Sequence, residues 1–289
     1  MLLPSPVHQI ILPSGAGISV KRDDLIDPYV SGNKWRKLKY HLNIAGAQGK
    51  THLVTFGGAW SNHLLATAAA AARYGFSATG YVRGELAGNE LLFLCSLFGM
   101  RLVPTERSSY RDKHQIFEHF HGSEEVAYFI DEGGSGEPAV QGCTEIIAEL
   151  NDRYDHIVVA AGTGTTAAGL LTGIVGAGLH TRLHVIPVLK PGGFLAADIG
   201  AWCSDTSQLS LHTDYHFGGY AKTTPELLRF IAGLARNTGM LTDPVYTGKM
   251  FFALNDLIVD GVIDQASSIL AIHTGGLTGL LGKRQAFSS

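Results

Sequence analysis

The residues best suited to chemistry lie in the stretch Ser31-Gly32-Asn33-Lys34-Trp35-Arg36-Lys37-Leu38. Apolar or aromatic residues recur with roughly helical spacing from Trp35 onward, which places Lys34 in the first turn of a helix. The positive end of that helix and the two cations that follow disfavour another ammonium there. An amine held partly neutral is a nucleophile, and nucleophilic lysines form Schiff bases with carbonyl compounds. Taken alone, the stretch is more typical of a solvated, positively charged helix face.

A second candidate is a turn rich in glycine and threonine. The apolar run at residues 156–161 leads into Gly162-Thr163-Gly164-Thr165-Thr166, and a helical pattern follows. The N–H groups and the dipole at a helix start favour a bound phosphate, and threonine hydroxyls add further donors. A structural strand-to-helix turn is the alternative.

The same turn also reads Gly162-x-Gly164-x-x-Ala167, a dinucleotide-binding pattern, so an NAD(P)-dependent oxidoreductase is a rival hypothesis. That class of enzyme needs an acidic residue about 20 positions further on, at the end of the next strand. The next apolar run ends in Pro187-Val188-Leu189-Lys190 and contains no acid. Lys190 leaves the 2′-phosphate of NADP as an option, so the rival is weakened and stays open.

Three further turns carry polar residues beside glycine. In the segment Phe56–His63, Ser61 and the N–H groups of a following helix can hold a carboxylate, although a plain helix cap explains the serine too. In the segment Gly239–Lys249, Tyr246 follows an Asp-Pro turn and offers either an active-site hydroxyl or a core ring. The segment Ile269–Gly276 reads as a strand that ends in Thr274 and two glycines, which a simple strand-end turn also explains.

The elements that must position these turns alternate between strand-like and helix-like runs. This alternation predicts an α/β fold with parallel sheets flanked by helices. Ligands bind at the carboxyl ends of such strands, which is where the glycine-rich turns fall. The expected strands are 52–56, 78–82, 101–104, 126–130, 156–160, 183–188 and 269–272. The expected helices are 61–74, 89–98, 110–120, 139–152, 165–177, 225–237 and 248–259.

Composition narrows the possible functions. Of the 289 residues, 45% are hydrophobic and 16% are charged, and the net charge of 22 − 25 = −3 gives no electrostatic case for nucleic acid or an anionic membrane. No apolar run approaches the roughly 18 residues of a membrane span. The N-terminal residues lack the features of a signal peptide, so we expect a cytoplasmic protein.

The three cysteines, which are far apart and odd in number, predict neither a disulfide framework nor a zinc site. Three of the thirteen histidines, His114, His119 and His121, do not share a helix face, so we expect them to be solvated and expect no metal site.

These motifs, in this order, resemble the pyridoxal-phosphate (PLP) enzymes of the tryptophan synthase β type, fold type II. The closest resemblance is to the 1-aminocyclopropane-1-carboxylate (ACC) deaminase and D-cysteine desulfhydrase family. Lys-Arg-Asp-Asp-Leu at residues 21–25, followed by Ser-Gly-Asn-Lys-x-Arg-Lys-Leu, is similar to its cofactor-lysine signature. Asp-Pro-Val-Tyr at residues 243–246 matches a second long signature, and Tyr220 lies where the family has another active-site tyrosine.

The resemblance implies a two-lobed enzyme that forms a homodimer. Residues 1–47 and 137–289 would form a large PLP-binding lobe, and residues 48–136 a small lobe inserted in it. Lys34 would hold the cofactor covalently, and Ser61 would bind the carboxylate of a small amino-acid substrate. Tyr246 and Tyr220 would assist proton transfer or shape the leaving-group pocket. The remaining cofactor contacts would come from Lys37, Asn62, Gly162, Thr163, Gly164, Thr165, Thr166, Thr247 and Thr274.

Two positions separate the branches of this family. ACC deaminases carry Glu after the signature tyrosine and Leu in the late Gly-Gly motif, whereas desulfhydrase-type members carry Ser or Thr and then Thr. Thr247 and Thr274 therefore imply β-elimination from a small amino acid such as D-cysteine, giving pyruvate, ammonia and sulfide. ACC deamination is the first alternative, and a PLP-binding protein without lyase activity is a more remote one. Trp60, where Gln is common, and Ala221-Lys222, where a Gly-x-Pro-like turn is common, depart from the family pattern.

Overall fold

The computed structural model describes residues 1–86 and 88–287 and divides into two compact units. Unit 1 is formed by Met1–Asn33 with Cys143–Ser289, and unit 2 by Lys34–Gly142. Both boundaries fall inside helices, α1 (Asn33–Ala47) and α5 (Glu137–Ala148). The lobe boundaries expected from the sequence, after residues 47 and 136, stay a prediction.

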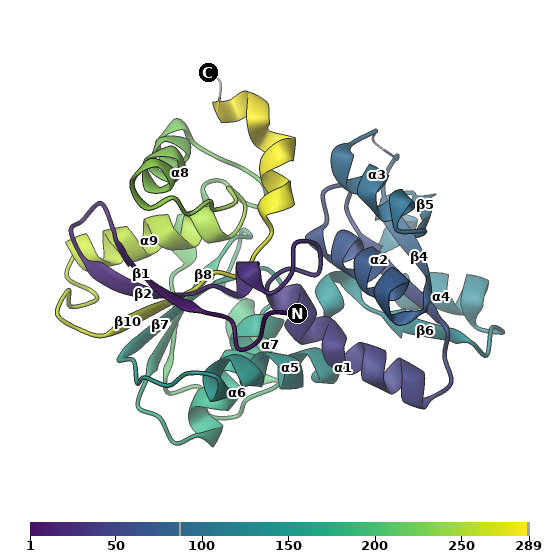
Figure 1. Cartoon of the computed structure of the whole chain (residues 1–289), viewed down its shortest axis with the longest axis horizontal. Coiled ribbons are helices and arrows are strands. Elements are labelled where there is room, and N and C mark those ends of the chain that lie inside the picture. The colour runs from purple at the N-terminus through teal and green to yellow at the C-terminus, as the bar shows by residue number, and fades with distance from the viewer. Residues whose placement is uncertain (87, 288–289) are drawn as a thin grey trace. The chain divides into compact units, whose positions relative to one another are not determined.

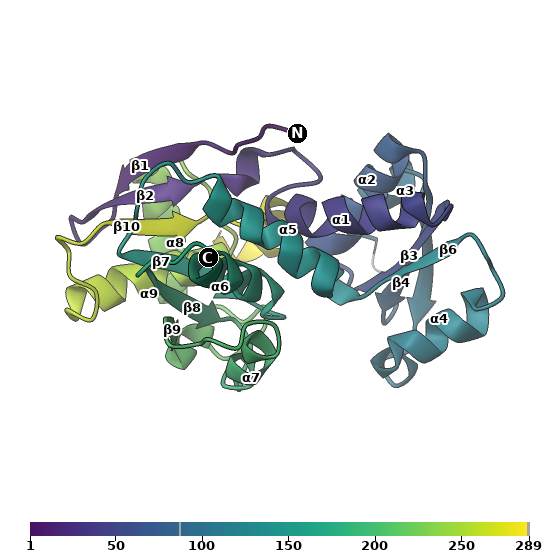
Figure 2. The same cartoon turned by 90° about the horizontal axis from the view of Figure 1, so that it is seen from below.

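Unit 1 is built on a six-stranded sheet with the strand order β1-β2-β10-β7-β8-β9, which can be followed in Figure 2. Only β1 runs antiparallel to its neighbour, and every other adjacent pair is parallel. The strands are β1 (Val7–Ile11), β2 (Gly17–Lys21), β7 (His156–Ala161), β8 (Arg182–Pro187), β9 (Leu209–Leu211) and β10 (Ile269–Ile272). The sequence analysis missed β1, β2 and β9, because no strand–helix alternation marks the N-terminal hairpin and β9 has only three residues.

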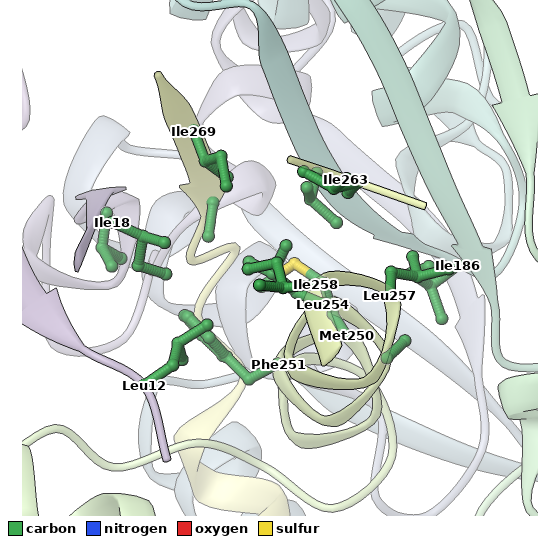
Figure 3. Close-up of a cluster of buried hydrophobic side chains, with 14 of the residues drawn as sticks. Leu12, Ile18, Ile186, Met250, Phe251, Leu254, Leu257, Ile258, Ile263 and Ile269 are labelled. Carbon is green, nitrogen blue, oxygen red and sulfur yellow. The ribbon is translucent and has the colours of Figure 1, made fainter. Parts of the chain in front are cut away.

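The helices of unit 1 cover both faces of this sheet. They are α6 (Thr165–Gly176), α7 (Leu195–Gly200), α8 (Pro225–Thr238) and α9 (Thr247–Val259). Helices α8 and α9 lie on one face and α6 on the other (Figure 1). Met250, Phe251, Leu254 and Leu257 follow helical spacing along α9, and they meet isoleucines of the sheet in the main core cluster (Figure 3).

Unit 2 has a four-stranded, wholly parallel sheet of order β5-β4-β3-β6. Its strands are β3 (His52–Gly57), β4 (Ser77–Arg83), β5 (Arg101–Thr105) and β6 (Ala127–Ile130), and its further helices are α2 (Asn62–Tyr74), α3 (Glu90–Leu97) and α4 (Lys113–His121). Alternation along β3 separates the two faces, because Phe56 joins an aromatic cluster with α4 while Thr55 meets His63 of α2. Helices α2 and α4 therefore cover opposite faces of the sheet (Figure 2).

The predicted α/β fold with parallel sheets flanked by helices is confirmed, and each predicted strand and helix is present with its ends shifted by a few residues. The helix expected from residue 110 begins at Lys113, because the Asp112 carboxylate accepts the Gln115 N–H and caps it. The helix expected to reach residue 152 ends at Ala148, where the chain closes a tighter turn between Leu150 N–H and the Ile147 carbonyl.

One histidine prediction is wrong. His121 was expected to be solvated, yet it is only 6% exposed. The end of α4 turns this ring into the sheet, where it stacks on Phe117 and its Nε2 lies 3.0 Å from the Tyr81 hydroxyl. His114 and His119 are exposed, as expected.

Cys95, Cys143 and Cys203 are buried free thiols. None of the helices described is long and apolar enough to cross a membrane.

The core cluster of unit 1 gives a stability prediction. Leu254 is completely buried, so Leu254→Ala should lower the free energy of unfolding by about 2–5 kcal/mol through lost burial and the cavity left behind. Val259, at the end of the same helix, is 65% exposed, and Val259→Ala should change it by no more than about 0.5 kcal/mol. Urea unfolding followed by circular dichroism compares the two variants. Equal losses would contradict the assignment of this cluster as the core.

Candidate active site

In unit 1, three segments distant in sequence meet at the carboxyl ends of β2, β7 and β10. Gly32 has a φ of +63°, and a Cβ atom there would overlap the Thr274 carbonyl oxygen. The same carbonyl accepts the Asn33 N–H at 3.2 Å. Asn33 also donates from its side-chain Nδ2 to the Thr166 hydroxyl at 2.9 Å. These contacts fix the position of Asn33. Lys34 is the next residue in the chain.

The turn Gly162–Thr166 lies between β7 and α6, as predicted. Gly164 precedes the helix with a φ of +75°, and having no side chain it leaves the first turn of α6 uncapped. The first N–H groups of a helix have no partner within it, so this turn presents donors and the positive end of the dipole. Thr163 and Thr165 hydroxyls lie 3.1 Å apart beside it. The turn therefore has the features of a phosphate-binding loop.

Tyr246 lies against this turn. A Cβ on Gly162 would come within 3.2 Å of the tyrosine ring and 3.4 Å of its hydroxyl, which is tighter than usual packing, so glycine makes room for the close approach. The ring of Tyr220 meets Tyr246 edge to face, with the centroids 6.1 Å apart. Unit 1 thus brings together both predicted tyrosines and the predicted phosphate loop.

A buried turn at Asp243–Thr247 fixes the backbone of Tyr246. The Asp243 carboxylate accepts hydrogen bonds from the N–H groups of Val245, Tyr246 and Thr247 at 2.8–2.9 Å. The Thr247 hydroxyl donates to the same carboxylate at 2.8 Å and accepts the Asp243 N–H at 2.9 Å. The Thr247 proton is therefore committed to Asp243, and its oxygen keeps one lone pair for a further donor.

The loop that carries Tyr220 is anchored by a buried cation. The Nζ of Lys249, a fully buried residue on α9, donates to the carbonyls of His216 and Gly219 at 2.8 and 2.9 Å. Burial lowers the pKa of Lys249 to about 8, while the nearby Asp243 acts in the opposite direction. Asp243 thus fixes the backbone of Tyr246, and Lys249 fixes the loop that carries Tyr220.

In unit 2, the predicted residues Lys34 and Lys37 share α1 and lie near a buried histidine. The Lys37 Nζ donates to the Gly133 carbonyl at 3.1 Å. His63, next to Asn62 on α2, is completely buried, and burial followed by the charges of Lys34 and Lys37 lowers its pKa well below the usual value. A neutral imidazole therefore stands close to both lysines.

The tautomer of His63 follows from its neighbours. The Thr55 hydroxyl donates to the Ile130 carbonyl at 2.9 Å, so it must accept the His63 Nε2–H, 2.7 Å away. The other nitrogen, Nδ1, then carries a lone pair. It is buried and has no hydrogen-bond partner in the part of the chain that the structure describes. The Nδ1 atom of His63 can therefore accept a hydrogen bond from a polar group bound near the two lysines.

Ser61 is the N-cap of α2, so the plain explanation of this serine holds in the structure. Its hydroxyl accepts the Leu64 N–H at 3.4 Å, and a Cβ on Gly57 would come within 2.6 Å of the same hydroxyl. Asn62 is the first residue of the helix. Both residues stand at the positive helix end after β3, and their predicted contacts with carboxylate and cofactor stay predictions.

The sequence analysis missed the polar residues that support the site. Asp243 and Lys249 lie within the signature around Tyr246, and His63 directly follows Ser61-Asn62. The sequence therefore shows that these residues are near the motifs, but it does not show which groups they contact. Asn33 likewise lies directly before Lys34 in the sequence. Its partner Thr166 lies 133 positions away, and only the fold reveals that pairing.

Comparison with known proteins agrees with this arrangement. The family model described as pyridoxal-phosphate dependent enzyme matches residues 3–275. A putative 1-aminocyclopropane-1-carboxylate deaminase of Pyrococcus horikoshii is 34% identical over 290 residues, covering 92% of this chain and 86% of the relative. A mitochondrial bifunctional D-cysteine desulfhydrase/1-aminocyclopropane-1-carboxylate deaminase of Arabidopsis thaliana is 30% identical over 320 residues, covering 99% and 80%.

A solved structure points the same way. The crystal structure of an ACC deaminase homologue has a TM-score of 0.89 at 30% identity, and the match covers 100% of this chain and 94% of the other. The family match favours PLP over the rival NAD(P) hypothesis. The chain belongs to the pyridoxal-phosphate dependent enzymes, with the fold type II architecture of tryptophan synthase β that its motifs predicted.

Proposed function

We propose that this enzyme catalyses β-elimination from a small D-amino acid that carries a thiol, with D-cysteine as the test substrate. D-cysteine and water would give pyruvate, ammonia and hydrogen sulfide. The observation that carries the proposal is the Thr247 hydroxyl, a neutral group that follows Tyr246 and donates its proton to Asp243. The names of the relatives include both D-cysteine desulfhydrase and ACC deaminase, so ACC deamination is the alternative.

The residues present fit PLP. The uncapped turn at Gly162–Thr166 suits its phosphate, and the buried lone pair of His63 lies near the two lysines of α1. When bound, PLP acts as an electron sink for the substrate's α-carbon. We assign Lys34 as its covalent attachment and Asn62 as the partner of its ring oxygen. Lys37, Gly162, Thr163, Gly164, Thr165 and Thr166 are assigned to its phosphate.

Lys34 and Ser61 would handle the substrate's α-carbon and carboxylate. The Nζ of Lys34 would be the base that takes the α-proton of the substrate. The neutral His63 beside it adds no positive charge and offers an acceptor for the resulting ammonium. Ser61 stands at the N-terminus of α2, where hydroxyl and helix dipole together favour a carboxylate.

Tyr246 and Tyr220 would serve the leaving group. A departing thiolate gains a proton easily, and a tyrosine hydroxyl within reach can supply it. Tyr246 is held by its backbone hydrogen bond to Asp243, and Tyr220 by the loop that Lys249 anchors. Trp60, directly before Ser61 and half-buried, would shape the pocket beside the substrate carboxylate.

Thr247 and Thr274 would set the type of reaction. A carboxylate at position 247 would keep the cofactor ring protonated and deepen the electron sink, as cleavage of a cyclopropane requires. A hydroxyl gives a weaker sink, which suffices when a thiolate leaves from the β-carbon. We further propose that the enzyme is cytoplasmic and that it forms a homodimer, the latter as its family resemblance implies.

Lys34→Ala should abolish the yellow absorbance of lysine-bound PLP, because no other residue is assigned to hold the cofactor covalently. Lys39→Ala, on the same helix, is the matched control and should keep it. Absorbance spectra of the purified proteins before and after borohydride reduction make the comparison. Reducible, protein-bound PLP in Lys34→Ala would contradict the assignment.

Pyruvate release should be fastest from D-cysteine, with kcat/KM at least about tenfold above that for L-cysteine or ACC, a difference of 1.4 kcal/mol in activation free energy. Lactate dehydrogenase coupling measures the pyruvate from all three. Efficient release from ACC would show that Thr247 and Thr274 were wrongly interpreted. A PLP-loaded protein that releases none would favour the non-catalytic alternative, and Trp60→Gln would then test whether the indole blocks the pocket.

Thr247→Val removes the hydroxyl but keeps the branched side chain, so kcat/KM for D-cysteine should fall about 10- to 100-fold, the value of one hydrogen bond to a charged group. Thr247→Ser restores the hydroxyl and should stay within about threefold of wild type. PLP content and the unfolding midpoint are recorded for both variants. Equal activity of the Val and Ser variants at equal PLP content would exclude a role for the hydroxyl.

A further inference from the structure

Two histidines and a glutamate converge in unit 2, away from the residues assigned to PLP. His52 begins β3, His121 ends α4, and Glu124 lies in the turn before β6. The His52 Nδ1 lies 3.2 Å and the His121 Nδ1 3.0 Å from the same Glu124 oxygen. Ser61 follows the opposite, carboxyl end of β3, about 17 Å along the strand. The cluster is therefore separate from the cofactor residues of this unit.

The outer nitrogen of each histidine is held by a buried hydroxyl. The His52 Nε2 lies 2.9 Å from the Thr79 hydroxyl, and the His121 Nε2 lies 3.0 Å from the Tyr81 hydroxyl. Histidines that bind metals almost always donate their second N–H in this way, which fixes the tautomer and aims the lone pair. With Nε2 as the donor, each Nδ1 would present its lone pair on the side where it lies against the Glu124 oxygen.

The spacing of the three candidate ligand atoms suits one ion. All three lie within 4.8 Å of one another. Tetrahedral Zn²⁺, with bonds of about 2.0–2.2 Å, separates its ligands by about 3.3 Å, close to the two distances found. The two rings meet at 82°, so they approach the carboxylate from different directions. Glu124 is 40% exposed, which leaves an open side for water ligands.

We propose that His52, His121 and Glu124 bind a divalent transition-metal ion of the Zn²⁺ type, with water completing its coordination. Two imidazole nitrogens and one carboxylate oxygen form a donor set that such ions prefer over Mg²⁺ or Ca²⁺. The ion ties the end of α4 and the turn before β6 to the start of β3. Its role is to stabilise unit 2 rather than to take part in the PLP chemistry.

The sequence predicted no metal site, because the histidines of the α4 segment do not share a helix face. The partners of His121 are not on that helix. His52 lies 69 positions earlier, and the sheet of unit 2 brings it alongside. Without an ion, the same three side chains form ordinary hydrogen bonds between imidazole N–H groups and the carboxylate, so binding must be measured.

The full-length, PLP-loaded protein is treated with chelator, dialysed into thiol-free buffer and titrated with Co²⁺ and then Zn²⁺. We expect one Co²⁺ per chain, with the visible absorption bands of a low-symmetry nitrogen- and oxygen-ligated site, and its displacement by Zn²⁺. Equilibrium dialysis with metal analysis gives the stoichiometry. Absence of saturable binding would overturn the proposal.

Variants locate the ion. Glu124→Gln and His52→Ala should each weaken Zn²⁺ binding at least about 100-fold, and Tyr81→Phe, which frees the outer nitrogen of His121, about 10- to 100-fold. His119→Ala removes an exposed histidine from the same helix and should change nothing. Retained PLP absorbance shows that each variant is folded. Unchanged binding in Glu124→Gln, or an equal loss in His119→Ala, would place the ion elsewhere and overturn the assignment.

Discussion

The candidate site of unit 1 depends on one close backbone approach. At Gly32 the chain passes so near the Thr274 carbonyl that no side chain fits, and its φ of +63° also favours glycine. The Asn33 N–H donates to the same carbonyl, and the Asn33 side chain reaches Thr166. One glycine therefore joins the ends of β2 and β10 to the first turn of α6. Lys34, the residue proposed to hold the cofactor, directly follows this junction.

Beside the proposed active-site tyrosines, unit 1 has a buried carboxylate and a buried ammonium that are held by hydrogen bonds. Asp243 accepts four hydrogen bonds from one turn, which removes the cost of burying a carboxylate and fixes Tyr246 and Thr247 together. Lys249 does the same for the loop of Tyr220 with two carbonyls. Such buried, satisfied groups make a rigid support, so the hydroxyls they hold keep their positions.

In unit 2, the groups around the lysines are not charged as in unit 1. They are histidine rings that burial keeps neutral. Burial and nearby lysines lower the pKa of His63 far below neutrality and burial lowers that of His41 to about 4, so both rings are neutral around Lys34 and Lys37. Neutral neighbours add no further positive charge beside the two lysines. In this unit, His63 and the start of α2 follow one end of β3, and the histidine–glutamate cluster lies at the other end.

Local pattern in the sequence was sufficient for the strands and helices from residue 52 onward except α7 and β9, for the glycine-rich turns and for the family, because periodicity and glycine-rich motifs are properties of neighbouring residues. It was insufficient for the hairpin of β1 and β2, the burial of His121 and the partners of Asn33, His63 and Thr247. These features depend on contacts between residues far apart in the chain, or on which hydrogen bond a side chain forms once it is buried. The sequence by itself determined which residues are available for PLP chemistry, and only the tertiary structure decided which of them are held, neutralised or paired, because burial and distance exist only in the folded chain.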